Sequence, residues 1–254
     1  MAYEKRNNIS YNQSVKTYFV MKRRKKMKKL VALCLAACMC LSLAACSNTA
    51  EKKSEGVMTY SEYAAAALDS EVVIEAYVQA TQSWWNDQIT VYAQDKEGGY
   101  FMYNMACSEA DSAKLVPGTK IKVTGYKSEW AGEVEIVDAT FEIEDGNYVA
   151  KAVDANSKFG KDELKDLQNQ LVSFSGLTVT AVSYKNDQPG DDIYVNLAKD
   201  GVEVPFCLEY YLNGSDEAFY NLVGNLEVGA TVDVEGFLYW YEGANPHLTK
   251  VTVK

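Results

Sequence analysis

The sequence predicts an all-β protein made of two tandem units, each with five strands preceded by a short helix. Short runs rich in β-branched and aromatic residues alternate with turn-forming residues, which is typical of small barrels and sandwiches. The stretch LVPGTKIKVTG at 115–125 returns as LEVGATVDVEG at 226–236. A helix-forming segment comes before the β-rich run in each half, so we expect a duplicated unit.

The chain begins with features of an export signal. A cationic stretch starts at Met21 and is followed by an apolar run that ends in Leu43-Ala44-Ala45-Cys46. This order is typical of a secretory signal peptide. The apolar run is also shorter than the roughly 20 residues that a membrane-spanning helix needs.

The last four residues of this run resemble the lipobox of bacterial lipoproteins. The resemblance implies cleavage before Cys46, palmitate-type acylation of the Cys46 sulfur and anchoring to the extracytoplasmic face of the cell membrane. The alternative is an ordinary signal peptide with a chance cysteine. We expect residues 1–45 to be leader and signal peptide and residues 46–56 to be a flexible tether. Translation could start at Met1, Met21 or Met27.

The first unit is expected over residues 57–148. Ser61 before a run of alanines predicts the short helix. Turn residues such as Pro117-Gly118 separate the strands that follow. We expect these strands at 71–81, 88–94, 99–106, 119–127 and 133–143.

The second unit is expected over residues 149–254. Its helix is predicted at 161–170, and the extra residues 212–225 are expected to include a helix between the third and fourth strands. The predicted strands are 171–184, 192–198, 202–209, 230–240 and 247–253.

The repeated glycines indicate how the strands bend. Gly118 and Gly229 permit a tight turn before the fourth strand, and Gly125 and Gly236 lie within it. A glycine inside a strand suggests a bulge, which a closing barrel needs. Two pairs of apolar residues, each two positions apart, are expected to face the core: Ile121 with Val123 and Val232 with Val234.

Several stretches together resemble the OB-fold modules that are attached to secreted bacterial nucleases and surface lipoproteins. The resemblance implies two tandem five-stranded OB-like barrels and a habit of binding, without implying a reaction. In the first unit the matching stretches are Val73–Val78, Gly99–Met105, Leu115–Gly125 and Glu133–Ala139. The second unit matches more loosely, at Glu163–Val179 and Leu226–Gly236.

The charge disfavours a polyanionic ligand. Without residues 1–45 the chain keeps 15 of its 25 basic and 34 of its 35 acidic residues, a net charge near −19 with no arginine. Nucleic-acid affinity depends largely on cationic side chains that neutralise phosphates. Lys120, Lys122 and Lys127 cluster in the first repeat but have no counterpart in the second. An oligosaccharide, peptide or protein partner is therefore preferred, with nucleic acid as an alternative.

Aromatic residues mark the loops that we expect to bind a ligand. Trp84 and Trp85 lie between the first two strands and Trp130 between the last two, and Tyr239-Trp240-Tyr241 occupies the equivalent place in the second unit. OB-folds bind oligonucleotides and oligosaccharides through these loops. The alternative is that the rings cap the barrels or join the two units.

No motif predicts catalysis, a cofactor or a metal site. His247 is expected to be structural, and Cys107 and Cys207 to be buried free thiols. The acidic loop 186–192 lacks the spacing of a Ca²⁺ site and is expected to be solvated. We therefore expect a binding or adaptor module and no enzyme. A carboxylate-dependent hydrolase and a structural spacer remain as alternatives.

Overall fold

A computed structural model describes residues 53–254 of the chain. The expected signal peptide, the lipid attachment at Cys46 and most of the tether lie outside these residues. Within the described part, none of the helices has the length and apolar character to cross a bilayer. All described residues belong to one compact unit, so the contacts between its two halves form part of the fold.

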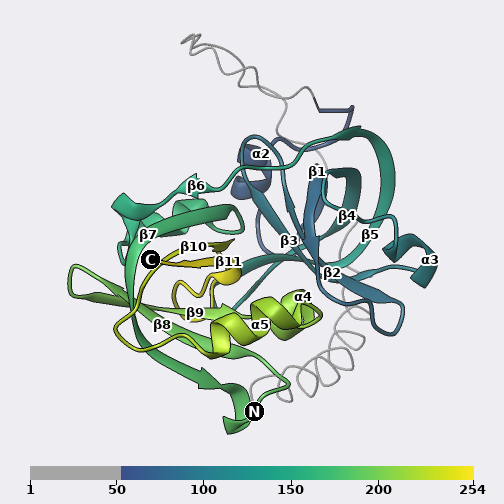
Figure 1. Ribbon diagram of the computed structural model, residues 1–254. Helices are drawn as coiled ribbons and strands as arrows, with labels where there is room; N and C mark the ends of the chain where they lie inside the picture. The colour runs from purple at the N-terminus through teal and green to yellow at the C-terminus, as the bar shows by residue number, and fades with distance from the viewer. Residues whose placement is uncertain (1–52) are drawn as a thin grey trace, which may run out of the picture. The chain divides into compact units, whose positions relative to one another are not determined.

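The first half forms a closed five-stranded barrel with the strand order β1-β2-β3-β5-β4 (Figure 1). A single parallel contact between β3 and β5, at Met102 and Ile136, closes the ring. The elements are α2 (Tyr60–Ala65), β1 (Glu71–Thr81), β2 (Gln88–Gln94), β3 (Gly99–Ala106), α3 (Glu109–Ser112), β4 (Thr119–Trp130) and β5 (Glu133–Asn147).

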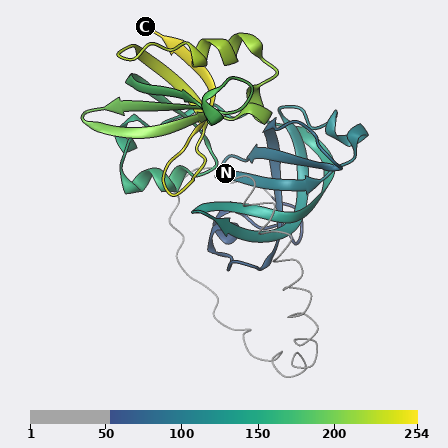
Figure 2. The ribbon, with the colours of Figure 1, turned by 90° about the horizontal axis from the view of Figure 1, so that it is seen from below.

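The second half forms a sheet with the order β10-β11-β9-β8-β7-β6, in which β10 also pairs with β7 (Figure 2). Its strands are β6 (Val153–Asp154), β7 (Leu171–Tyr184), β8 (Ile193–Lys199), β9 (Val202–Leu208), β10 (Thr231–Phe237) and β11 (His247–Val253). Its helices are η1 (Asn156–Lys158), η2 (Asp162–Leu167), η3 (Lys185–Asp187), α4 (Tyr210–Asn213) and α5 (Glu217–Gly224).

The predicted all-β class is confirmed, and an OB-like barrel is present in the first half. The long strands lie close to their predicted positions, although β4 and β5 extend further because they pair along a long hairpin. The strand predicted at 230–240 ends earlier, since β10 stops at Phe237. The helix predicted at 161–170 is instead a 3₁₀ helix, Asp162–Leu167. The sequence pattern also missed α3 and the two-residue strand β6, which are too short to show a periodicity.

The repeated glycines do what their spacing predicts. Gly118 and Gly229 have φ angles of +95° and +93°, which residues with a Cβ rarely adopt. The strand register shifts at Gly125 and Gly236, as expected for bulges. A Cβ on Gly236 would lie 2.5 Å from the carbonyl oxygen of His247 on β11, so a larger residue would push these strands apart.

Lysine and threonine side chains fix the two ends of α2. Thr59 caps its first turn, and Glu62 completes the capping box by accepting from the Thr59 amide at 2.8 Å. The buried Lys127 ammonium donates to the carbonyls of Tyr63, Ala64 and Ala66 at 2.7–3.0 Å. These carbonyls lie at the end of α2, where a helix leaves most carbonyls without a partner of its own, so β4 holds α2 against the barrel.

The chain joins the first barrel earlier than the predicted tether suggests. Lys53 forms a buried ion pair of 2.8 Å with Asp95 and also donates to the backbone oxygen of Glu75. Asp95 in turn accepts from the Tyr100 hydroxyl at 2.9 Å. Lys53 is therefore held by the fold, although it lies within the expected tether of residues 46–56.

Each half has its own apolar core, and a third cluster lies between them. This third cluster contains Tyr92 and Phe101 from β2 and β3, with Phe237 and Tyr239 from the second half. We call the whole contact between the two halves, which includes this cluster, the junction. The junction determines which surfaces remain open to a ligand.

Candidate ligand site at the junction of the two halves

The junction covers the outer face of β2 and β3. Tyr92 stacks on Phe237 with ring centroids 4.7 Å apart, and Phe101 meets Tyr239 edge-on at 5.3 Å. The Tyr92 hydroxyl lies 2.7 Å from His247 Nδ1. OB-folds often bind ligands on this strand 2–3 face. In this protein the face of the first barrel is occupied by the second half of the same chain.

His247 has a structural role here. Its ring is buried and stacks on Tyr239 with a centroid distance of 4.3 Å. Burial lowers the pKa of His247 to about 3, so the ring is neutral over the physiological range. A neutral ring in the junction agrees with the structural role expected from the sequence.

Glu133 connects the two halves through a buried carboxylate. Its Oε2 atom accepts from Gln168 Nε2 at 3.0 Å and from the Trp240 amide at 2.8 Å. Its Oε1 atom is buried without a hydrogen-bond partner. Burial raises the pKa of Glu133 to about 8, so the carboxyl group is largely protonated at neutral pH. The group therefore acts as a neutral acceptor that orders the segments around it.

Four of the six predicted aromatic residues belong to the junction. Tyr239 is buried there, and Trp130 lies 5.2 Å from Tyr241 between ring centroids. Trp240 packs so closely that a Cβ on Gly132 would lie 2.6 Å from its Cδ1 atom. These residues join the two halves, which was the alternative considered from the sequence. Ligand binding by them stays a prediction.

The remaining two predicted residues, Trp84 and Trp85, point in different directions. Trp84 packs against the first core and donates from Nε1 to the Cys107 carbonyl at 2.9 Å. Trp85 has 77% of its surface exposed, the highest value among the exposed large apolar residues of the described chain. Of these adjacent tryptophans, Trp84 is therefore a partly buried residue against the core and Trp85 is a surface residue.

A hollow of about 280 Å³ opens between the connection that carries these tryptophans and the second half. We call it the junction pocket. The Ser83 amide donates to the Tyr211 carbonyl at 2.8 Å and ties its two sides together. None of its lining residues is charged. They are Thr81, Gln82, Ser83, Trp84, Ile89, Ser112, Ala113, Tyr211, Leu212 and Ser215.

Of these lining residues, only Trp84 was predicted from the sequence as a site residue. Serine, threonine and glutamine are frequent in any surface loop, so these residue types do not indicate a ligand site. They come from the β1–β2 connection, α3 and the segment after α4, which the fold brings together. The one feature of the sequence that could have indicated the pocket was the extra segment 212–225, because Leu212 and Ser215 from its beginning line one side of the pocket.

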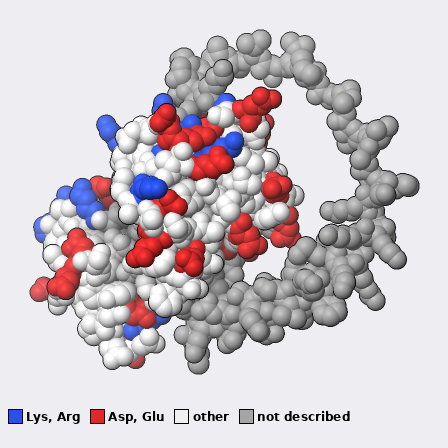
Figure 3. All heavy atoms as spheres, turned by 90° about the vertical axis from the view of Figure 1, so that its right-hand side faces the viewer, with Lys and Arg blue, Asp and Glu red and all other residues white. Residues whose placement is uncertain are grey.

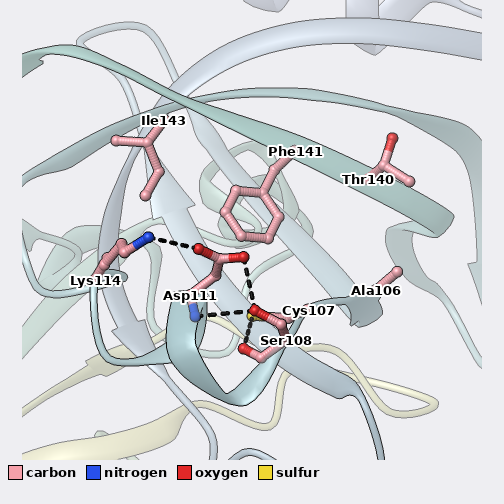
Figure 4. Close-up of a pocket in the computed structure, with 8 residues that line it drawn as sticks. All are labelled: Ala106, Cys107, Ser108, Asp111, Lys114, Thr140, Phe141 and Ile143. Atoms are coloured by element: carbon pink, nitrogen blue, oxygen red, sulfur yellow. Dashed lines mark hydrogen bonds and ion pairs between the residues drawn. The ribbon is translucent and has the colours of Figure 1, made fainter.

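A second hollow, of about 500 Å³, lies beside α3 (Figure 4). Asp111 accepts from Lys114 and from the Ser108 hydroxyl, both at 2.7 Å, so its charge is already balanced. Cys107 lines the same hollow, and burial raises the pKa of its thiol. The thiol is therefore a poor nucleophile at neutral pH. Cys107 and Cys207 are both free and buried, as predicted.

The predicted lysine cluster does not form an open basic patch. Lys120 forms ion pairs with Glu75 at 2.8 Å and with Glu144 at 2.9 Å. Lys122 lies two residues further along the same face of β4, opposite Glu142 on β5. Lys127 is buried at the end of α2, so it does not join the other two lysines. On the face shown in Figure 3, basic atoms form small separate groups among acidic ones.

The buried carboxylates do not form a hydrolytic pair in either hollow. Burial also raises the pKa of Glu209 to about 8, and its Oε2 atom accepts from the Leu212 amide at 2.6 Å. Neither Glu209 nor Glu133 lines the junction pocket or the hollow beside α3.

In the acidic loop, Lys185 bridges Asp191 and Asp192 at 3.0 Å each. The described residues contain no group of three or more metal-ligating side chains.

No protein family model and no curated protein matches this chain. Some solved structures resemble it. A murine DNA-binding protein bound to double-stranded DNA is 9% identical with a TM-score of 0.37, covering 72% of this chain and 96% of that one. The p204 HINb domain is 11% identical with a TM-score of 0.32, covering 71% and 95%. A replication protein A heterotrimer bound to single-stranded DNA is 13% identical with a TM-score of 0.29, covering 72% and 49%.

Two of these three proteins are described as bound to DNA. That description lies closer to the nucleic-acid alternative than to the preferred oligosaccharide or protein ligand. At such low identities and with TM-scores below 0.5, the likeness carries no argument about what this chain binds.

Proposed function

We propose that this protein is a lipid-anchored, extracytoplasmic binding module that holds an uncharged polar ligand in the junction pocket. The observation that carries the proposal is the absence of any charged residue among the ten that line the pocket. In a chain with 24% charged residues, an uncharged lining rich in hydroxyl and amide groups is a specific environment. Ligand sites typically combine such groups with aromatic surface.

The electrostatics support a neutral ligand over a polyanion. A phosphate backbone needs lysine or arginine for most of its affinity. The chain from residue 46 onward has no arginine and a net charge near −19, and Lys120 and Lys127 are already engaged by protein groups. A nucleic-acid ligand and a hydrolytic activity are therefore ranked below a neutral ligand. The binding test includes oligonucleotides as the nucleic-acid alternative.

The test is a binding screen of the purified protein by calorimetry against neutral oligosaccharides, uncharged peptides and single- and double-stranded oligonucleotides. Ala113 lines the pocket, and Ala110 is an exposed residue of the same helical segment outside it. We expect saturable binding of a neutral ligand that Ala113→Arg weakens at least tenfold. Ala110→Arg should bind like the wild-type protein, and both variants should melt within about 3 °C of it.

Equal binding by the Ala113→Arg and Ala110→Arg variants would refute the site. Binding of oligonucleotides alone would replace the proposed ligand class by nucleic acid. Correct folding of both variants is checked by the melting temperature, so a loss of binding is not confused with unfolding.

A further inference from the structure

The hydroxyl groups of the junction pocket match the hydrogen-bonding pattern of a sugar. A hydroxyl group can donate and accept at the same time, as sugar hydroxyls also do. Ser83 Oγ donates to the Tyr211 carbonyl at 3.2 Å, and Ser112 Oγ donates to the Glu109 carbonyl at 2.8 Å. Each of these two oxygens keeps lone pairs that can accept from a ligand hydroxyl. The pocket therefore offers fixed acceptors as well as apolar surface from Trp84 and Leu212.

The size of the pocket limits how much ligand it can hold. Its volume of about 280 Å³ is slightly below the range of roughly 300–1,000 Å³ that encloses drug-sized ligands. A short end of a larger molecule fits this space. The remainder of such a molecule must lie on the surface next to the pocket.

Trp85 follows Trp84, which lines the pocket, and hydrogen bonds hold its backbone in a turn. Its amide and carbonyl exchange hydrogen bonds with Gln88, both at 3.0 Å. The two residues between them, Asn86 and Asp87, have φ angles of +50° and +59°. Positive φ at both central positions is the pattern of a type I′ turn, one of the two-residue connections preferred in β-hairpins. The turn therefore presents a largely exposed indole ring on a fixed backbone.

A fixed backbone reduces the entropy cost of binding, since the main chain that carries the ring is already ordered when a ligand arrives. Consecutive Cα atoms are about 3.8 Å apart, so Trp85 begins at the edge of the pocket that Trp84 lines. The core position of Trp84 directs Trp85 outward. The position of Trp85 is thus suited to a flat, partly apolar ligand surface that extends from the pocket.

We infer that the ligand is an oligosaccharide whose end occupies the junction pocket and whose next rings stack on Trp85. This inference rests on the proposed function, because it names the ligand class and the second contact of the same site. The saccharide supplies hydroxyl groups to the serine side of the pocket and an apolar ring face to the indole.

The test uses neutral cello-, chito-, malto- and xylo-oligosaccharides of two to six units, with dissociation constants measured by calorimetry. For the best series, the wild-type protein should bind longer chains more tightly. Trp85→Ala should weaken binding of the longest chain at least tenfold and leave the dimer within about threefold. Trp85→Phe should retain most of the affinity, because it keeps a flat apolar ring. Tyr126→Ala, at another exposed aromatic residue, should bind normally.

The possible failures can be separated. If Ala113→Arg abolishes binding but Trp85→Ala binds every chain length like the wild-type protein, Trp85 has no role and only this inference is refuted. If no saccharide binds while another neutral ligand binds in an Ala113-dependent way, the ligand class is refuted and the pocket stands. If Ala113→Arg has no effect on any ligand, the proposed function itself is refuted.

Discussion

The buried carboxyl group of Glu133 makes the stability of this protein depend on pH. Its pKa is about 8 in the folded protein, against 4.5 for an ordinary glutamate, because burial disfavours the charged form. Between these two values the folded state holds a proton that the unfolded state has released. Stability must therefore fall as the pH rises from about 4.5 to about 8, by about 1.4 kcal/mol per pH unit. Over the whole window the loss is on the order of 5 kcal/mol.

Glu133→Gln removes this titration while it keeps the shape of the side chain. The amide oxygen can still accept from Gln168 and from the Trp240 amide. The amide nitrogen takes the place of Oε1, which in the protonated carboxyl group is also a donor without a partner, so the exchange adds little cost below pH 8. We therefore expect the variant to be about as stable as the wild-type protein at pH 5 and more stable than it at pH 8.

The assay is thermal unfolding of both proteins between pH 5 and pH 8. The contribution of Glu133 over this range is about 3–4 kcal/mol, or roughly 10 °C in melting temperature for a protein of this size. Glu209 has a similarly raised pKa and remains in the variant, so the pH dependence should be reduced and should not vanish. If the melting temperatures of the two proteins run parallel from pH 5 to pH 8, the argument from the buried carboxyl group is wrong.

Two further substitutions test the packing of the chain. Lys53→Ala removes one partner of a buried ion pair and should lower the free energy of unfolding by about 3–5 kcal/mol. Lys114→Ala, in an exposed pair, should lower it by less than about 1 kcal/mol. Similar denaturant midpoints for the two variants would show that Lys53 is not held in the fold. Gly99→Ala places a Cβ 2.2 Å from the backbone carbon of Asn169 and should lower the melting temperature by at least about 5 °C through overpacking. Gly243→Ala has no heavy atom within 4 Å of its new Cβ and should be nearly neutral, and equal melting of these two variants would contradict the close contact at the junction.

The strand pattern was readable from the sequence because it depends on neighbours in the chain. Successive side chains of a strand point to opposite faces of the sheet, and this pattern is visible in the sequence. The strands β1, β2 and β3 therefore begin and end at the predicted residues. The glycines at 118 and 229 were also predictable, since a positive φ angle restricts the residue type at one position. The predicted helix at 161–170 differs from η2, a 3₁₀ helix over Asp162–Leu167, because a short run of helix-forming residues does not distinguish the two helix types.

The site was less predictable, since contacts between distant segments determine it. The sequence placed Trp130 and Trp240 in loops that often bind ligands, and both in fact lie in the junction. The sequence did not show that the side chain of Lys127 turns inward to the end of α2. A side chain's partner depends on which elements meet, and one sequence without coordinates does not contain that information.

By itself the sequence determined the local features of this protein: the strands, the glycine turns and the acidic composition. Each depends on residue type or on spacing along the chain. The tertiary structure decided which aromatic residues are buried, which lysines are neutralised and where an uncharged pocket opens. These features depend on burial and on the pairing of residues such as Tyr92 and His247, which lie far apart in the chain and meet only after folding.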